Sequence, residues 1–196
     1  MATTLNPEAS SGISIGYSVG SVADWLRRIT VRICGHRGSR GSGVIWRDGL
    51  VVTNAHVALG KLHDLEFFDG GKAQGRLVAR DAGNDLAAIK MDVSGLAAAA
   101  IRSARELRAG EMVIAVGNPW DGEGAVSAGI LHRAAGKQPV IFADIRLAPG
   151  NSGGPLADAR GNVIGVNSAI FRGLGCAVTS DAVQEFLLKS GVLEAV

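Results

Sequence analysis

The stretch Pro149-Gly150-Asn151-Ser152-Gly153-Gly154-Pro155-Leu156 places a serine in the middle of a glycine-rich loop. A nucleophilic serine needs its hydroxyl exposed on a tight turn, with backbone N–H groups directed at the oxygen that becomes negative during acyl transfer. Glycines on both sides allow the φ/ψ values that turn consecutive amides toward one point. Taken by itself, the stretch is also compatible with a plain turn between two strands.

Two further segments supply partners for Ser152. Residues 51–57, VVTNAHV, end an apolar run at His56, and histidine is the usual base because its pKa lies near neutrality. Residues 84–90, NDLAAIK, place Asp85 before another apolar run, where its carboxylate can orient the imidazole. Asp81, four residues earlier, is a competing carboxylate. The order His, Asp, Ser along the chain matches that of the chymotrypsin triad.

The composition favours an all-β fold. The chain has 196 residues, 47% hydrophobic and 19% charged, a globular balance, with 28 glycines and only 5% aromatic residues. Many glycines between short Val/Ile/Leu runs indicate tight turns between short strands. We expect eleven strands, at residues 30–34, 43–46, 50–53, 64–68, 76–80, 86–91, 112–116, 125–132, 140–146, 163–170 and 176–179.

These strands, with helices only at the ends, predict two small antiparallel β-barrels, and with the triad order this arrangement resembles a chymotrypsin-like double antiparallel β-barrel. The N-terminal barrel is expected over about residues 30–101 and the C-terminal barrel over about residues 112–180. Residues 1–19 are interpreted as a flexible N-terminal arm, and residues 20–196 as one domain. A short helix is expected at residues 21–29, and a closing helix at residues 181–190.

Several classes of function are excluded by what the sequence lacks. The net charge is +2 and the charges are scattered, so no nucleic-acid partner is expected. No apolar run approaches the roughly 18 residues of a membrane span, and the first 20 residues lack the pattern of a signal peptide, which predicts a cytoplasmic protein. No cofactor or metal site is expected, because the histidines outside the motif show no ligand spacing: His36, His63 and His132. The two cysteines, Cys34 and Cys176, are expected to be buried thiols.

The motifs together resemble the HtrA (DegP-like) branch of the trypsin-like serine peptidases. The resemblance rests on residues 53–57, 85–87 and 150–156, and extends to Gly41-Ser42-Gly43 and to residues 165–169. It covers the chain from about residue 28 to residue 188. HtrA proteins usually carry PDZ domains after the peptidase, whereas the sequence beyond Ser152 is expected to hold only the last strands and a helix.

The resemblance implies a role for each matching residue. Ser152 would be the nucleophile, His56 the general base and then acid, and Asp85 the orienting carboxylate. The N–H groups of Gly150 and Ser152 would form the oxyanion hole, with Asn151 between them. The substrate-binding residues would be Arg146 at the floor of the S1 pocket and the strand against which substrate backbone pairs, Ser168, Ala169 and Ile170.

Two positions depart from the relatives. Asn151 stands where pancreatic-type enzymes have the aspartate that pairs with a new N-terminus, so that activation switch is expected to be absent. Arg146 replaces an apolar or small S1 residue. Its side chain can point outward, which leaves an apolar pocket for an aliphatic P1 residue, or inward, which would favour an acidic one.

The sequence therefore predicts a serine endopeptidase acting on polypeptides through an acyl-enzyme on Ser152. The alternative is a non-catalytic, chaperone-like module that binds extended or unfolded segments. Family analogy also suggests a homo-oligomer, a trimer in HtrA enzymes, and a periplasmic or secreted location that conflicts with the cytoplasmic one expected from the N-terminus.

Overall fold

A computed structural model describes residues 11–34, 40–119, 124–133 and 139–194, with backbone alone for residues 11–18. Two helices, one 3-10 turn and twelve strands follow one another along the described chain. In order they are α1 (Ser11–Arg28), β1 (Thr30–Cys34), β2 (Arg40–Arg47), β3 (Leu50–Thr53), β4 (Leu62–Phe67), β5 (Lys72–Asp81), β6 (Leu86–Met91), η2 (Ala104–Glu106), β7 (Met112–Gly117), β8 (Ala125–Arg133), β9 (Val140–Asp144), β10 (Pro155–Asp158), β11 (Val163–Phe171), β12 (Leu174–Thr179) and α2 (Ser180–Lys189).

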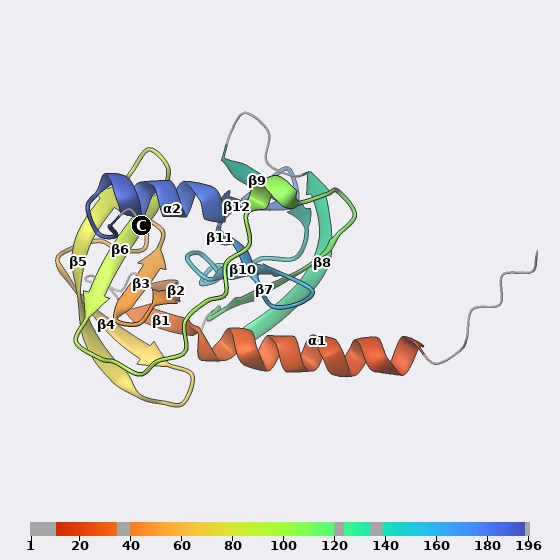
Figure 1. The fold of residues 1–196 in the computed structure, drawn as a ribbon, viewed down its shortest axis with the longest axis horizontal. Helices are drawn as coiled ribbons and strands as arrows, with labels where there is room; N and C mark the ends of the chain where they lie inside the picture. The colour runs from red at the N-terminus through yellow and green to blue at the C-terminus, as the bar shows by residue number, and fades with distance from the viewer. Residues whose placement is uncertain (1–10, 35–39, 120–123, 134–138, 195–196) are drawn as a thin grey trace, which may run out of the picture.

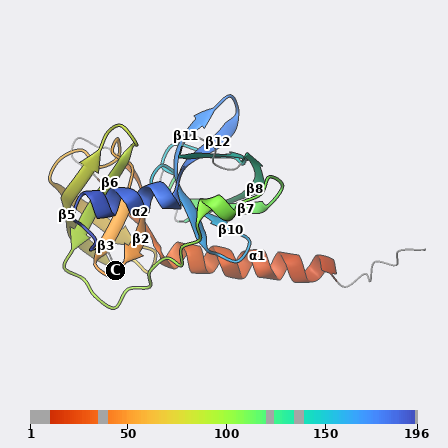
Figure 2. The same cartoon turned by 45° about the horizontal axis from the view of Figure 1, so that its top comes forward.

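The strands form two closed antiparallel barrels, which confirms the predicted fold class. The first has the strand order β1-β2-β3-β6-β5-β4 and the second β10-β11-β12-β9-β8-β7. The barrels lie side by side, and the helix α2 starts at the end of β12 in the second barrel and lies over the first (Figures 1 and 2). Each barrel has its own apolar cluster, and a third cluster joins them with both helices around buried residues such as Val44, Ile114 and Phe186.

The strand prediction missed β10. This strand begins at Pro155, directly after two glycines, and all four of its residues are buried between β7 and β11. Glycine and proline are poor strand formers, but proline is accepted as the first residue of a strand, where its missing N–H costs no ladder hydrogen bond. The structure therefore has twelve strands where eleven were expected.

The N-terminal prediction was wrong in its boundaries. The helix α1 begins at Ser11, ten residues before the expected start, so residues 11–19 are helical and not part of a flexible arm. Residues 1–10 of the expected arm lie outside the described part. Three glycines and several serines in residues 10–20 lower helix propensity, which is why local sequence suggested a later start. The C-terminal turns of α1 pack on the core through Val22, Trp25 and Leu26.

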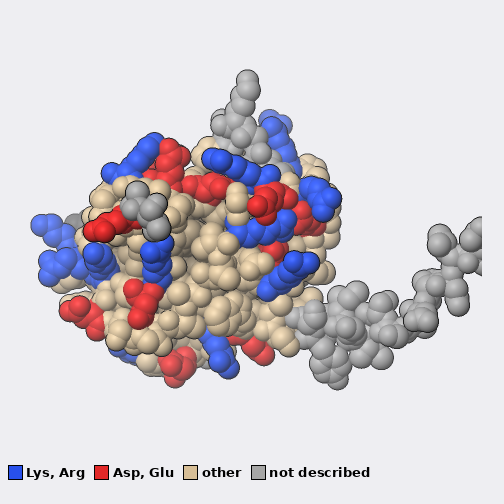
Figure 3. All heavy atoms as spheres, viewed as in Figure 1, with Lys and Arg blue, Asp and Glu red and all other residues tan. Residues whose placement is uncertain are grey.

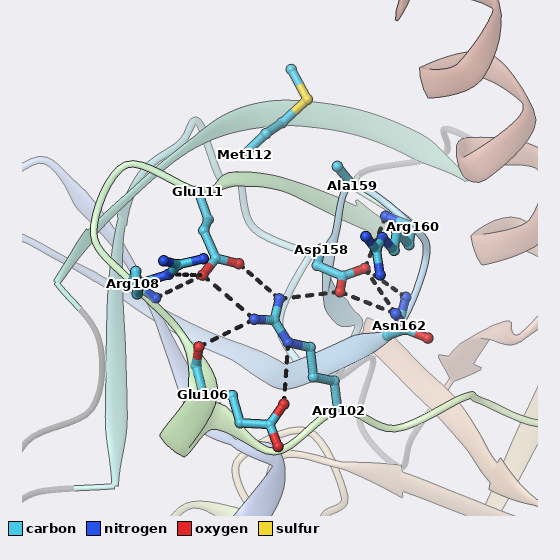
Figure 4. A pocket seen from close by; sticks show the side chains of 9 residues that line it. All are labelled: Arg102, Glu106, Arg108, Glu111, Met112, Asp158, Ala159, Arg160 and Asn162. Atoms are coloured by element: carbon cyan, nitrogen blue, oxygen red, sulfur yellow. Dashed lines mark hydrogen bonds and ion pairs between the residues drawn. The ribbon is translucent and has the colours of Figure 1, made fainter.

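The segment between the barrels is held by Arg102. Its guanidinium lies 2.7 Å from Glu111 and 3.3 Å from Asp158 at the end of β10, and donates to the main-chain carbonyl of Glu106 (Figure 4). Asp158 is almost completely buried, and burial would raise its pKa. Hydrogen bonds from Asn162, Arg160 and Arg102 outweigh burial, so the pKa of Asp158 is lowered. These ion pairs are structural ties between the connecting segment and the second barrel.

The surface carries mixed charge. On the face drawn in Figure 3, basic and acidic side chains are interspersed, without a stripe of one sign. Among the described helices, none is long and apolar enough to cross a membrane.

Candidate active site

His56 and Asp85 meet because they lie beside paired strands of the first barrel. The turn that carries His56 follows β3, Asp85 immediately precedes β6, and Thr53 at the end of β3 is paired with Ala87. The side chain of Asn54 donates to the main-chain carbonyl of Asp85 at 3.0 Å and ties the two segments together. Asp85 has a φ of +54°, a left-handed conformation that is rare outside glycine and is found at functional sites.

The imidazole of His56 rests on the Asp85 carboxylate. Its Nδ1 lies 2.9 Å from each carboxylate oxygen, and the His56 main-chain N–H donates to Oδ1 at 3.1 Å. The hydrogen bond to Asp85 raises the pKa of His56, against an opposing effect of burial. Burial would raise the pKa of Asp85, but hydrogen bonds from His56 and Ser168 outweigh it and the pKa is lowered. Asp85 is therefore an anion that holds Nδ1 as a donor at neutral pH.

Ser152 reaches this pair from the second barrel. Its hydroxyl donates to the main-chain carbonyl of Ser168 at 3.2 Å, and the hydroxyl of Ser168 donates to Asp85 Oδ2 at 2.6 Å. Ser168 thus contacts both Ser152 and Asp85 across the barrel interface. Within the described residues, no hydrogen bond joins Ser152 to His56, so the serine hydroxyl is turned toward Ser168 in this structure.

The residues before Ser152 form a tight turn. The N–H of Asn151 donates to the carbonyl of Ala148 at 3.0 Å, and Gly150 between them has a φ of +103°. With Pro149 at the second position, these are the features of a type II turn. Asn151 is buried, and its N–H is occupied by this bond. The N–H groups of Gly150 and Ser152 donate to no acceptor in the described part of the chain.

A cavity of about 310 Å³ opens beside Ser152. The expected substrate residues Ser168, Ala169 and Ile170 line it. Its other walls are Leu147, Ala148, Pro149, Asn151, Ser152 and Asn167. The sequence did not single out Leu147, which lines the cavity from the loop after β9.

Arg146 does not line the cavity. Its side chain is exposed, between the buried Ile145 and the half-buried Leu147. The structure therefore does not place Arg146 at the floor of this cavity, and its exposed side chain corresponds to the outward alternative. The resemblance to the family had placed Arg146 there by sequence position alone.

The competing carboxylate, Asp81, has a different role. Its Oδ1 accepts the N–H groups of Gly83 and Asn84, and its Oδ2 accepts from the Asn84 side chain at 2.7 Å. It shapes the turn that leads to Asp85, and in the described part of the chain the imidazole of His56 is hydrogen-bonded to Asp85 and not to Asp81. Among the described residues, no cluster of three or more His, Cys, Asp or Glu could hold a metal ion, and Cys34 and Cys176 are both free thiols.

Comparison with known proteins agrees with this geometry. The profile of the trypsin-like peptidase domain matches residues 41–166, which include all three motif segments. The chain belongs to the trypsin-like peptidase family. The peptidase domain is 36% identical over 163 residues to a probable periplasmic serine endoprotease, DegP-like, of Halomonas elongata, covering 76% of this chain and 34% of that protein. It is 35% identical over 165 residues to serine protease HTRA1 of Xenopus laevis, with 76% and 36% covered.

Solved structures of HtrA-type proteases share the fold of the peptidase domain. The HtrA-type protease AlgW with a tripeptide superposes with a TM-score of 0.81 at 30% identity, over 88% of this chain and 64% of that chain. The serine endoprotease from Yersinia pestis gives a TM-score of 0.81 at 26% identity, over 88% and 66%. The chain spans about a third of the length of the curated relatives named above.

Proposed function

We propose that the peptidase domain is a serine endopeptidase with Ser152 as nucleophile, His56 as general base and Asp85 as the orienting carboxylate. The observation that supports this most directly is a line of hydrogen bonds from Ser152 through Ser168 and Asp85 to His56, which joins residues 96 positions apart in the sequence. The family and the HtrA-type relatives support the same activity.

The reaction follows from the donors and acceptors at the site. The Ser152 hydroxyl turns from Ser168 to Nε2 of His56 and attacks the peptide carbonyl carbon, while its proton passes to Nε2. The N–H groups of Gly150 and Ser152 donate to the oxygen that becomes negative. The imidazolium then protonates the leaving amine, and the acyl-enzyme remains on Ser152. In the second half of the reaction His56 takes a proton from the attacking water and then returns it to the oxygen of Ser152 as the acyl group leaves. Asp85 stays ionised throughout and stabilises the imidazolium.

The substrate is proposed to be an extended polypeptide that adds a strand at β11. β10 pairs with β11 only as far as Val166, and β11 continues to Phe171 beside the cavity, which leaves an edge for backbone pairing. Mainly apolar side chains, among them Leu147, Ala169 and Ile170, line the cavity, and Arg146 lies outside it. The P1 residue is therefore proposed to be aliphatic, such as Val, Ala, Leu or Met.

The alternative, a non-catalytic module that binds extended segments, is favoured by one observation, the Ser152 hydroxyl turned away from His56. Labelling with a fluorophosphonate separates the two functions, because it requires an activated serine. We expect labelling of the wild-type chain at Ser152 and none of Ser152→Ala. Absence of labelling, together with absence of cleavage in a peptide library read by mass spectrometry, would establish the binding module instead.

Assembly and location are also proposed by analogy. HtrA-type relatives suggest a homo-oligomer, a trimer in that branch, and a relative named as periplasmic suggests action in the periplasm. Analytical ultracentrifugation and fractionation of cells that produce the natural protein test these two proposals.

A further inference from the structure

Ser42 on β2 connects both barrels at the back of the active-site loop. Its side chain is fully buried, and its hydroxyl donates to the carbonyl of Gly150 at 2.7 Å. The same hydroxyl accepts the main-chain N–H of Asn118 at 2.8 Å and its side-chain amide at 3.3 Å. The main-chain N–H of Ser42 donates to the carbonyl of Ser152 at 2.8 Å. One residue of the first barrel thus holds the carbonyls of Gly150 and Ser152 in the second.

These two carbonyls belong to the residues whose N–H groups are the proposed oxyanion donors. The peptide group between Gly150 and Asn151 lies between the two donors, so its orientation sets how they are placed relative to each other. The loop has little freedom on its other side, because a Cβ on Gly150 would lie 2.5 Å from the carbonyl oxygen of Asn118. Preorganised donors contribute to catalysis only if their positions are held before the charge develops.

The hydrogen bonds continue from Ser42 to the helix α1. The side-chain oxygen of Asn118 accepts the N–H of Gly124 at 3.1 Å, and the carbonyl of Gly124 accepts from Nε of Arg27 at 2.9 Å. Arg27 is on the last turns of α1, where it also pairs with Asp24 at 2.7 Å. From Arg27 toward its N-terminus, α1 first packs on the core through Trp25 and Val22, and its N-terminal turns project beyond the barrels (Figure 1).

We propose that Ser42 is a positioning residue for the oxyanion donors, and that the chain Arg27–Gly124–Asn118–Ser42–Gly150 couples the docking of α1 to their alignment. This inference rests on the proposed peptidase function and adds a residue that acts through others. A hydroxyl is required, because only it can donate to Gly150 and accept from Asn118 at once. Removing it takes away the hydrogen-bond partner of two half-buried main-chain groups, the carbonyl of Gly150 and the N–H of Asn118.

Ser42→Ala, made in the full-length polypeptide, tests the end of this hydrogen-bond series that lies next to Gly150. Loss of one oxyanion donor costs about 10²–10³ in kcat, so misalignment is expected to lower kcat by about 10–100-fold and to change KM by less than about twofold. The affinity for a peptide aldehyde, whose adduct places an oxyanion at the donors, is expected to fall by the same factor as kcat.

Ser180→Ala is the matched control. Ser180 is also a buried serine whose hydroxyl donates to a carbonyl, that of Arg102 at 2.6 Å, but it contacts none of the active-site loop. We expect a similar loss of thermal stability in both variants and a loss of kcat and aldehyde affinity only in Ser42→Ala. Equal kcat and aldehyde affinity in the two variants would overturn the inference.

The outer end of the hydrogen-bond chain is tested by Arg27→Met, which keeps the aliphatic stem and removes the hydrogen bond to the carbonyl of Gly124. We expect a fall in kcat of about threefold or more, and no change in Arg28→Met, the exposed neighbour on α1. Unchanged kcat in Arg27→Met would overturn the coupling to α1. Fluorophosphonate labelling of the wild-type chain is measured alongside, and its absence would overturn the peptidase function itself and not the role of Ser42 within the loop.

Discussion

Replacing Asp85 by asparagine should prevent His56 from acting as the base while leaving the shape of the active site. The carboxylate now faces three donors: the Nδ1–H of His56 at 2.9 Å, the main-chain N–H of His56 at 3.1 Å and the hydroxyl of Ser168 at 2.6 Å. An amide has one oxygen and one NH₂ group in their place. The oxygen can keep the main-chain N–H, and the NH₂ group then faces Nδ1 and the Ser168 hydroxyl.

This arrangement selects the wrong tautomer of His56. Nδ1 must accept from the NH₂ group, so the ring proton moves to Nε2, where it blocks transfer of the Ser152 proton. In triad peptidases this change lowers kcat by about 10⁴, which corresponds to about 5 kcal/mol of transition-state stabilisation. We expect a loss of that size in Asp85→Asn with little change in KM.

The pH profile provides a second, independent measure. Asp85 raises the pKa of His56, and burial alone lowers it. At acid pH kcat/KM falls because His56 of the free enzyme becomes protonated. The midpoint of this fall in the wild-type chain should therefore lie above the ordinary histidine pKa of about 6.5. In Asp85→Asn the interactions that raise the pKa of His56 are lost, and the burial that lowers it remains. The midpoint of the acid limb should therefore move to lower pH.

The assay is hydrolysis of a fluorogenic peptide with an aliphatic P1 residue, from pH 5 to pH 9. Asp81→Asn is the matched control, because Asp81 is a nearby carboxylate whose bonds go to Gly83 and Asn84. We expect Asp81→Asn to keep the wild-type acid limb. Retention of a tenth of the activity in Asp85→Asn, or an equal loss in Asp81→Asn, would refute the assignment of Asp85.

Three further predictions concern the nucleophile, the loop and the pocket. Ser152→Ala should lower kcat by about 10⁶, roughly 8 kcal/mol, in peptide hydrolysis, and a loss below tenfold would contradict its role. Gly153→Ala should lower the free energy of unfolding by about 3 kcal/mol in urea, because φ is +86° and a Cβ would overlap the Ser42 carbonyl. Gly70→Ala, with a φ of +84° and open space around it, should lose only about 1 kcal/mol, and equal losses would refute the steric argument. Arg146→Ala should leave the P1 profile of a peptide library unchanged, whereas a lost acidic preference would show that its side chain reaches the pocket.

Local sequence was sufficient to predict the chemistry because each catalytic residue type lies within a short motif. Each motif meets a local requirement of backbone and side chain. His56 ends one apolar run, Asp85 precedes another, and Ser152 lies between glycines. The two barrels were predictable for the same reason, since short apolar runs with glycine turns form antiparallel strands. The predicted strand at residues 50–53 agrees with β3 in both boundaries.

Features that depend on contacts between distant segments needed the tertiary structure. β10 was missed because its burial between β7 and β11 outweighs the poor propensity of its first residue. The early start of α1 was missed for lack of a strong helical pattern. Arg146 was placed at the pocket floor by its position in the family pattern, which does not specify the direction of a side chain in the loop after β9.

The sequence by itself determined the family and the nature of the fold, and it is sufficient to propose the three catalytic residues, because all of these follow from residue types and their order. Only the tertiary structure decided that Ser168 contacts both Ser152 and Asp85, that Leu147 faces the cavity and that Ser42 holds the carbonyl of Gly150 from 108 residues away. A hydrogen bond across the barrel interface depends on the relative placement of two separately closed sheets. No local pattern encodes that placement, because it results from the packing of the whole core between them.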